Sequence, residues 1–150
     1  MLSKRCCSLL ILLLFVCINE CKGEKWNDVV NWINEAVPCK LVVIAGAKGG
    51  IWAQYPKDAK LPTNEEFKKL YNDMKNDFSD IEKNGITLAG ITYTFVGGND
   101  RSVTAKNGNS YLVAVPTKQT IVVAVSEDGN EKQLNEAVNK STDVMIGMGF

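Results

Sequence analysis

The amino-acid sequence predicts an α+β fold, with a mostly antiparallel central sheet of about seven strands. The N- and C-terminal helices are expected on one face of this sheet and a further helix on the other. Two observations predict this arrangement. Short β-rich runs follow one another with tight turns between them, which favours an antiparallel meander. Two of these runs are apolar on both faces of the strand, and such strands need helices above and below them.

The first helix of the folded domain is predicted at residues 26–37. Apolar residues recur there at helical spacing, and Pro38 ends the pattern. Trp32 lies off this apolar stripe. The residues of the stripe are Trp26, Val29, Val30, Ile33 and Val37.

A hairpin is predicted next, with strands at 41–45 and 51–55 joined by a glycine-rich turn. Strict alternation would place Ile51, Ala53 and Tyr55 on one face of the second strand. Trp52 would then share the other face with a glycine and a glutamine. This is an unexpected place for the largest side chain of the hairpin.

A second helix is predicted after a loop, because Thr63 and Glu66 have the spacing of a capping box. From residue 84 the pattern is β, with a half-buried strand at 91–95. Strands at 111–115 and 121–125 are apolar on both faces, and a last helix is predicted over 131–148. The apolar stripe of the second helix is predicted to contain Phe67, Leu70, Tyr71, Met74 and Phe78.

Residues 1–23 have the three-part layout of a secretory signal peptide, with cleavage predicted before Glu24. Two basic residues precede a thirteen-residue apolar run, which is followed by polar and small residues. The run is shorter than the roughly 20 residues that span a bilayer, which disfavours a permanent anchor. An uncleaved N-terminal anchor acylated at Cys6 and Cys7 is the alternative. The folded domain is therefore predicted at 24–150, in a secreted protein or one of the secretory pathway.

The charge of the chain argues against nucleic acid as a partner. It has 17 basic and 17 acidic residues, and removal of residues 1–23 leaves the domain slightly acidic. No basic surface is thus available to displace counterions from phosphates. Cys39 is the one cysteine after residue 23, so the domain forms no internal disulfide.

Residue types that most catalysis requires are missing. The chain has no histidine, which eliminates histidine-dependent triads and most zinc sites. The glycine-rich stretch 46–50 lacks the Lys-Ser/Thr ending of a phosphate loop and leads into a strand. The sequence therefore predicts a binding module that is not an enzyme and carries no metal or cofactor.

Three stretches resemble profilins, in the order and at the separation of that family. They are "KWNDVVNWI" at 25–33, "IAGAKGGIWAQY" at 44–55 and "NGITLAGITY" at 84–93. The likeness runs from residue 25 to residue 150 without a large insertion. It implies a small protein, expected to be a monomer, that binds monomeric actin on one face and proline-rich peptides on another and so regulates actin assembly.

The resemblance implies a shallow aromatic groove for polyproline between the terminal helices. Trp26 and Trp52 match the two tryptophans of that groove, and Phe150 is placed to supply a terminal ring. Two aromatic positions of the family are occupied instead by Val29 and Val144. Because an aromatic contact contributes on the order of 1 kcal/mol, each lost ring is expected to weaken binding by about tenfold.

The actin face implied by the resemblance uses the later strands and the start of the last helix. Lys106 matches a basic position there, whereas the basic positions before the last strand are mostly lost, with Lys118 near that place. The helix start carries Glu131, where some profilins have histidine or asparagine. Because like charges repel, weaker association with acidic actin is expected. Phosphoinositide binding, known in the family, is not expected on a net acidic domain.

The signal-like segment leaves a second hypothesis open, which is an exported profilin-fold protein with a binding role unrelated to actin. A cytoplasmic, cytoskeletal protein is the alternative if residues 1–23 are retained. Asn139 begins a glycosylation sequon, Asn139-Lys140-Ser141, on the last helix. A glycan there would both prove export and obstruct that helix.

Overall fold

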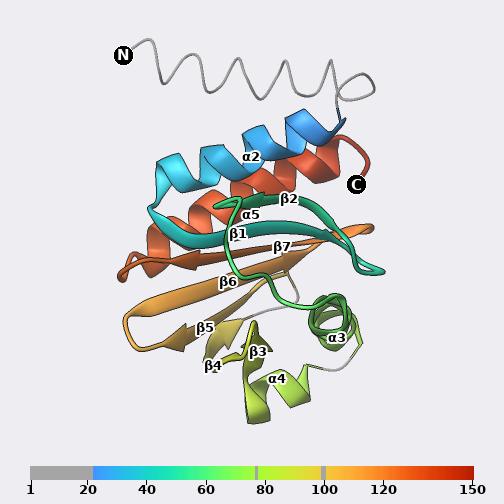
Figure 1. Cartoon of the computed structure of the whole chain (residues 1–150). Helices are drawn as coiled ribbons and strands as arrows, with labels where there is room; N and C mark the ends of the chain where they lie inside the picture. The colour runs from blue at the N-terminus through green and yellow to red at the C-terminus, as the bar shows by residue number, and fades with distance from the viewer. Residues whose placement is uncertain (1–21, 77, 99–100) are drawn as a thin grey trace.

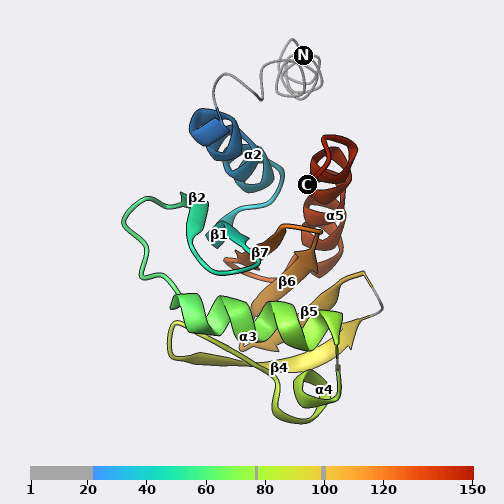
Figure 2. The same cartoon turned by 90° about the vertical axis from the view of Figure 1, so that its right-hand side faces the viewer.

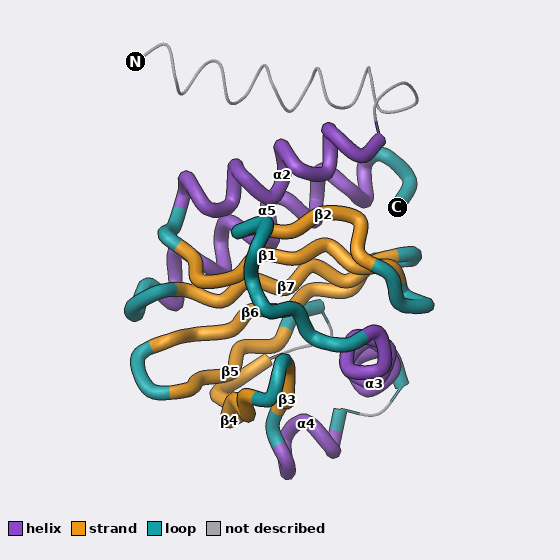
Figure 3. The backbone as a smooth tube through the Cα atoms, viewed as in Figure 1, coloured by secondary structure: helices purple, strands orange, loops and turns teal. Residues whose placement is uncertain are grey.

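The computed structural model describes residues 22–76, 78–98 and 101–150. Within them, seven strands form one antiparallel sheet in the order β2-β1-β7-β6-β5-β4-β3 (Figures 1 and 3). The strands are β1 (Cys39–Gly46), β2 (Ile51–Tyr55), β3 (Ile86–Leu88), β4 (Ile91–Gly98), β5 (Val103–Asn107), β6 (Ser110–Pro116) and β7 (Thr120–Ser126). The helices are α2 (Lys22–Ala36), α3 (Asn64–Lys75), α4 (Ser79–Asn84) and α5 (Glu131–Gly147).

The helices form two layers, one on each side of the sheet. Figure 2 shows α2 and α5 together on one side, with α3 and α4 on the other. Central strands supply side chains to both layers: Val42 and Ile44 of β1 pack under α2 and α5, and Val43 packs toward α3. We call these packed interiors the α2–α5 core and the α3–α4 core. The predicted layering, and the burial of both faces of the central strands, are confirmed.

The predicted strand alternation is wrong at the start of β2. Ile44 pairs with Ala53 and Ala45 pairs with Ile51, so Trp52 is the extra residue of a β-bulge. The bulge turns Ile51 into the α3–α4 core, while Ala53 stays in the α2–α5 core. Trp52 packs against the α2–α5 core as well, and therefore lies on the side of the terminal helices.

The capping box at the start of α3 is confirmed. The Glu66 N–H donates to the Thr63 Oγ1 at 3.1 Å, and the Thr63 N–H donates to the Glu66 Oε1 at 2.9 Å. The placement of Phe78 on the same helix is wrong. The helix ends at Lys75, and Phe78 is the N-cap of the short helix α4, with its ring edge-on to Phe95.

The break between α3 and α4 has a local cause. Asn76 is the C-cap of α3, and Ser79 and Asp80 open α4. Side chains of these types compete with the helix backbone for hydrogen bonds and favour helix ends. Phe78 still packs against the α3–α4 core, which is the side of the sheet that the predicted apolar stripe would face.

The N-terminal helix begins at Lys22, before the Trp26 at which the prediction started. Residues 1–21, and with them nearly all of the predicted signal peptide or anchor, lie outside the described residues. In the part of the chain that the structure describes, no helix has the length and hydropathy needed to cross a membrane.

Candidate functional site

Three aromatic rings meet where α2, β2 and the C-terminus come together. The ring centroids of Trp26 and Trp52 are 5.5 Å apart, and the two planes are tilted by 45°. The ring of Phe150 lies edge-on to both indoles, at 5.0 Å from Trp26 and 5.8 Å from Trp52. We call Trp26, Trp52 and Phe150 the aromatic cluster.

A glycine makes room for the second indole. A Cβ atom added to Gly46 would lie 3.2 Å from the Trp52 Nε1 and 2.9 Å from the Gly49 carbonyl oxygen. Any larger side chain would therefore push the indole or the turn away. Together with the bulge in β2, this glycine sets the position of Trp52.

A Schellman motif at the end of α5 brings Phe150 to the cluster. Gly149 is in the left-handed region, with φ of 95°, and its N–H donates to the Ile146 carbonyl at 2.9 Å. The Phe150 N–H donates to the Met145 carbonyl at 3.0 Å. These two bonds reverse the chain after the helix, so that the terminal ring folds back onto the tryptophans.

The predicted groove residues differ in exposure. Trp26 is 3% exposed and Val29 is 5% exposed, so both belong to the α2–α5 core. Trp52 and Phe150 are half-buried and present ring surface to solvent. Val144 is half-buried on α5. The structure thus brings Trp26, Trp52 and Phe150 into contact, whereas Val29 is a core residue.

The indole N–H groups of the cluster remain available. Neither Trp26 nor Trp52 donates a side-chain hydrogen bond to any residue that the structure describes.

Trp32 is half-buried against the α2–α5 core, although it lies off the predicted apolar stripe. The roles of Gly46 and Gly149 were not predicted, although a glycine after a helix is a common C-terminal signal.

The three residues of the expected actin face do not form one patch. Lys106 pairs with Tyr111 at the start of β6, and its Nζ lies 5.5 Å from the centroid of that ring. Lys118 lies in the turn after β6, at the opposite end of that strand from Lys106. At the strand rise of ~3.3 Å per residue, the two lysines are roughly 20 Å apart. Glu131 begins α5 and lines a shallow hollow there with Lys132, Asn135, Glu136 and Asn139.

The sequon asparagine is engaged within the fold. The Asn139 Nδ2, the atom that would carry a glycan, donates to the Asn135 carbonyl at 2.7 Å, and the Asn139 Oδ1 accepts from the Arg101 Nε at 2.9 Å. Arg101 also pairs with Asp143. Ser141, the third residue of the sequon, is 3% exposed.

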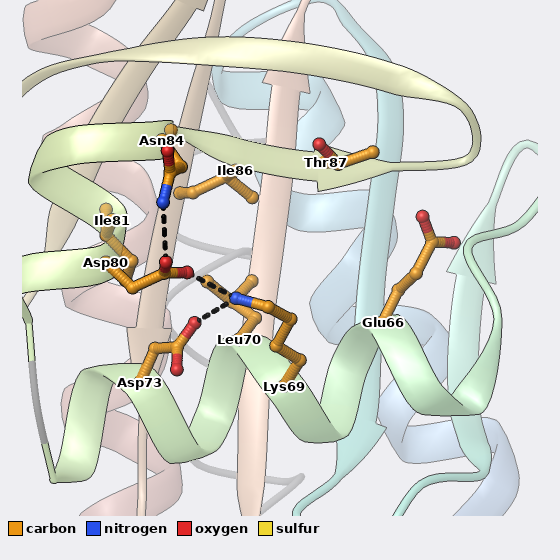
Figure 4. Close-up of a pocket in the computed structure, with 10 residues that line it drawn as sticks. Glu66, Lys69, Leu70, Asp73, Asp80, Ile81, Asn84, Ile86 and Thr87 are labelled. Carbon is orange, nitrogen blue, oxygen red and sulfur yellow. Dashed lines mark hydrogen bonds and ion pairs between the residues drawn. The ribbon is translucent and has the colours of Figure 1, made fainter.

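A polar cavity of about 360 Å³ lies between α3, α4 and β3 (Figure 4). The Lys69 Nζ lies 2.7 Å from an Asp73 oxygen and 2.5 Å from an Asp80 oxygen, and Asn84 donates to Asp80. Lys69, followed by Asn84, holds the pKa of Asp80 below its ordinary value. Because these groups satisfy one another, the cluster braces α4 against α3.

Cys39 is a buried free thiol. Its Sγ donates to the Val37 carbonyl at 3.0 Å, and burial, with Glu127 nearby, raises its pKa to about 12. A thiol with so high a pKa is a poor nucleophile. Across the described ranges, no group of three or more His, Cys, Asp or Glu side chains is arranged to hold a metal.

Comparison with known proteins assigns the fold. The family model described as Profilin matches residues 24–150. This chain belongs to the profilin family. It is 34% identical to the profilin of Drosophila melanogaster over 129 residues, which cover 83% of this chain and 98% of the fly protein.

Solved profilins share the architecture. Acanthamoeba castellanii profilin IB has a TM-score of 0.73 and 28% identity, covering 83% of this chain and 99% of that protein. Mouse profilin IIa, solved in complex with a double repeat from the FH1 domain of mDia1, has a TM-score of 0.62 at 16% identity. That comparison covers 80% of this chain and 97% of the mouse protein. The predicted fold class and profilin membership are thereby confirmed.

Proposed function

We propose that this profilin-family protein binds proline-rich peptides and monomeric actin, and so regulates actin assembly. The observation that carries the peptide site is the contact of Trp26, Trp52 and Phe150 between the two terminal helices. The solved complex of mouse profilin IIa with an FH1 double repeat supports a peptide ligand for the family. Profilins are binding proteins rather than enzymes, and the role proposed here needs no cofactor.

The cluster suits a polyproline helix for a physical reason. Such a helix is preformed and has no internal hydrogen bonds, so it loses little entropy on binding and its carbonyls remain free to accept. Trp52 and Phe150 supply the half-buried ring surface. Trp26, being buried, fixes the position of both rings from below. The indole N–H of Trp52, which has no acceptor among the described residues, can donate to a proline carbonyl.

The valines limit the strength of this site. Val29 is buried and adds no surface to the groove, and Val144 offers a small aliphatic one. Calorimetric titration with a proline decapeptide tests the proposal. Saturable binding, weaker by about tenfold per missing ring than that of a fully aromatic profilin, is expected. Absence of binding at millimolar peptide would rule the site out.

The actin proposal rests on family membership and on Lys106, which is exposed on β5. Thr104 of the same strand accepts a hydrogen bond from Asn135 in the first part of α5. Glu131 faces the same end of the molecule and reduces the attraction to an acidic partner. A pyrene-actin assembly assay tests it, with slower assembly expected at excess protein. Lys106→Glu should abolish the effect, and Lys118→Glu, at the far end of β6, should leave it unchanged. Unaltered assembly with the native protein would favour the non-actin role.

We also propose that residues 1–23 are a signal peptide and that the domain is exported. The three-part layout of the segment supports this, as does the start of the family match at Glu24. Export would separate the protein from most actin and would favour the alternative, a profilin fold with a different binding role. N-terminal sequencing decides between them. A start near Glu24 supports export, and a start at Met1 supports a cytoplasmic or membrane-anchored protein.

A further inference from the structure

A second cavity, of about 300 Å³, opens on the α3–α4 side of the sheet, away from the aromatic cluster. The residues that line it come from β1, the loop after β2, the β3–β4 hairpin and β7. Figure 1 shows the loop after β2 crossing in front of the sheet on its way to α3. The apolar side chains that line the cavity are Leu41, Pro56, Ala59, Leu88, Ala89, Ile91 and Val125.

The walls of this cavity are held in place by hydrogen bonds. The Gln54 Nε2 donates to the carbonyls of Pro56 and Lys57, at 3.2 and 2.9 Å, and so fixes the loop. The Ala89 N–H donates to the Glu66 Oε1 at 3.2 Å and ties the β3–β4 turn to α3. A ligand would therefore meet a cavity that is already formed, which reduces the entropy lost on binding.

The polar side chains lining the cavity are Lys40, Lys60 and Tyr93, and none of the described carboxylates lines it. Neither lysine forms an ion pair with any residue that the structure describes. Tyr93 is largely buried but its hydroxyl reaches solvent, and it makes no hydrogen bond within the described ranges. Burial raises the pKa of Tyr93 above its ordinary value of 10.0, so the hydroxyl keeps its proton and can donate.

We propose that this cavity binds a medium-chain fatty acid as its carboxylate. Two ammonium groups and a hydroxyl complement an anionic head group, because hydrogen bonds to an ionised carboxylate are charge-assisted and strong. The apolar walls complement an alkyl chain. Ile91, at 44% exposure, is one of the large apolar side chains left open, and the chain would cover it.

The volume sets the length of the ligand. A methylene group fills about as much space as a water molecule, ~30 Å³. A cavity of about 300 Å³ therefore holds an alkyl chain of roughly eight to ten carbons. Decanoate is the probe of choice, and decanol, with the same chain and no charge, is its matched control.

Calorimetric titration of the full chain with decanoate, below its micellar concentration, tests the proposal. Saturable one-site binding is expected, with decanol bound about tenfold more weakly or worse. The double variant Lys40→Gln/Lys60→Gln should lose about tenfold in decanoate affinity while its decanol affinity stays unchanged. Both lysines are exposed, so the variant should fold, which circular dichroism verifies.

Two comparisons complete the test. Tyr93→Phe keeps the ring in the core and should weaken decanoate but not decanol. Lys83→Gln/Lys140→Gln removes two exposed charges elsewhere and should change neither affinity. Lack of saturable decanoate binding would overturn the proposal, as would equal affinities for decanoate and decanol. Because the cavity is remote from the aromatic cluster, the proline decapeptide should bind equally well with and without decanoate.

Discussion

The ring of Phe150 stands edge-on to the indole of Trp26, with planes at 88° and centroids 5.0 Å apart. Edge-to-face pairs of this kind contribute about 0.5–1.5 kcal/mol beyond their buried area. The contact joins Phe150, which follows α5, to helix α2. The C-terminus is therefore part of the candidate peptide site, and the geometry of the last turn should affect ligand binding.

Replacement of Trp52 by alanine should weaken binding of a proline decapeptide by about tenfold or more. The indole supplies exposed ring surface and an N–H that donates to no residue of the described ranges. Its half-buried position limits the loss of stability. Calorimetric titration measures the change. Trp32→Phe is the matched control, since Trp32 lies on α2 outside the cluster. Unchanged affinity in Trp52→Ala would place the peptide elsewhere.

Gly149→Ala should lower both stability and peptide affinity. Its φ of 95° disfavours any residue with a Cβ, at a cost of about 1 kcal/mol, and relief of that strain would move Phe150. Urea unfolding and peptide titration measure the two effects. Gly147→Ala is the control, because this helical position has open space around an added Cβ. It should stabilise the helix by about 0.5–1 kcal/mol. If both variants behave alike, the Schellman motif is not what positions the ring.

The sequence was sufficient to predict what depends on local periodicity. The helix at 26–37, the hairpin at 41–55 and the two-faced strands were predictable because each burial pattern is carried by neighbouring residues. The face of Trp52 was not predictable, because the bulge depends on how β2 pairs with β1. The extra residue changes the face of Ile51, which precedes it, but not that of Ala53, which follows it. Strict alternation therefore gave the wrong face for Ile51.

The candidate sites show the same division. Trp26 and Trp52 were identifiable from motifs, but the burial of Val29 follows from how α2 sits on the sheet. The separation of Lys106 from Lys118 follows from the direction of β6 and is invisible in their spacing along the chain. Helix α4 is only six residues long, too short for periodicity to reveal.

The ion pairs of Lys69 with Asp73 and Asp80, which we call the Lys69 brace, should make the free energy of unfolding depend on pH in the acid range. Because the folded-state pKa of Asp80 is lowered, its contribution is fully present above its ordinary pKa of 3.8 and is lost as pH falls through the folded value. Lys69→Met should therefore destabilise the protein at pH 6, and the difference from the native protein should shrink below pH 3.8. Urea unfolding across pH 2.5–6 measures this.

The matched control for the brace is Lys140→Met, which removes an exposed lysine of α5. It should show no such convergence with the native protein at low pH. A constant difference between Lys69→Met and the native protein at every pH would contradict the electrostatic account. It would indicate that Lys69 acts through the packing of its aliphatic chain.

The buried thiol of Cys39 should be unreactive until the protein unfolds. With its pKa raised to about 12, almost none of it is thiolate at pH 8, where an unfolded cysteine is partly ionised. Alkylation at pH 8, followed by mass-spectrometric mapping of the peptide that contains Cys39, should show labelling in 8 M urea but not in buffer. Fast labelling of the native thiol at pH 8 would show that β1 opens readily at its first residue.

The same thiol should make the fold less stable at high pH. A raised folded-state pKa contributes stability that is fully present below the ordinary pKa of 9.0 and is lost as pH rises toward about 12. Cys39→Ser should weaken this dependence of the free energy of unfolding on pH.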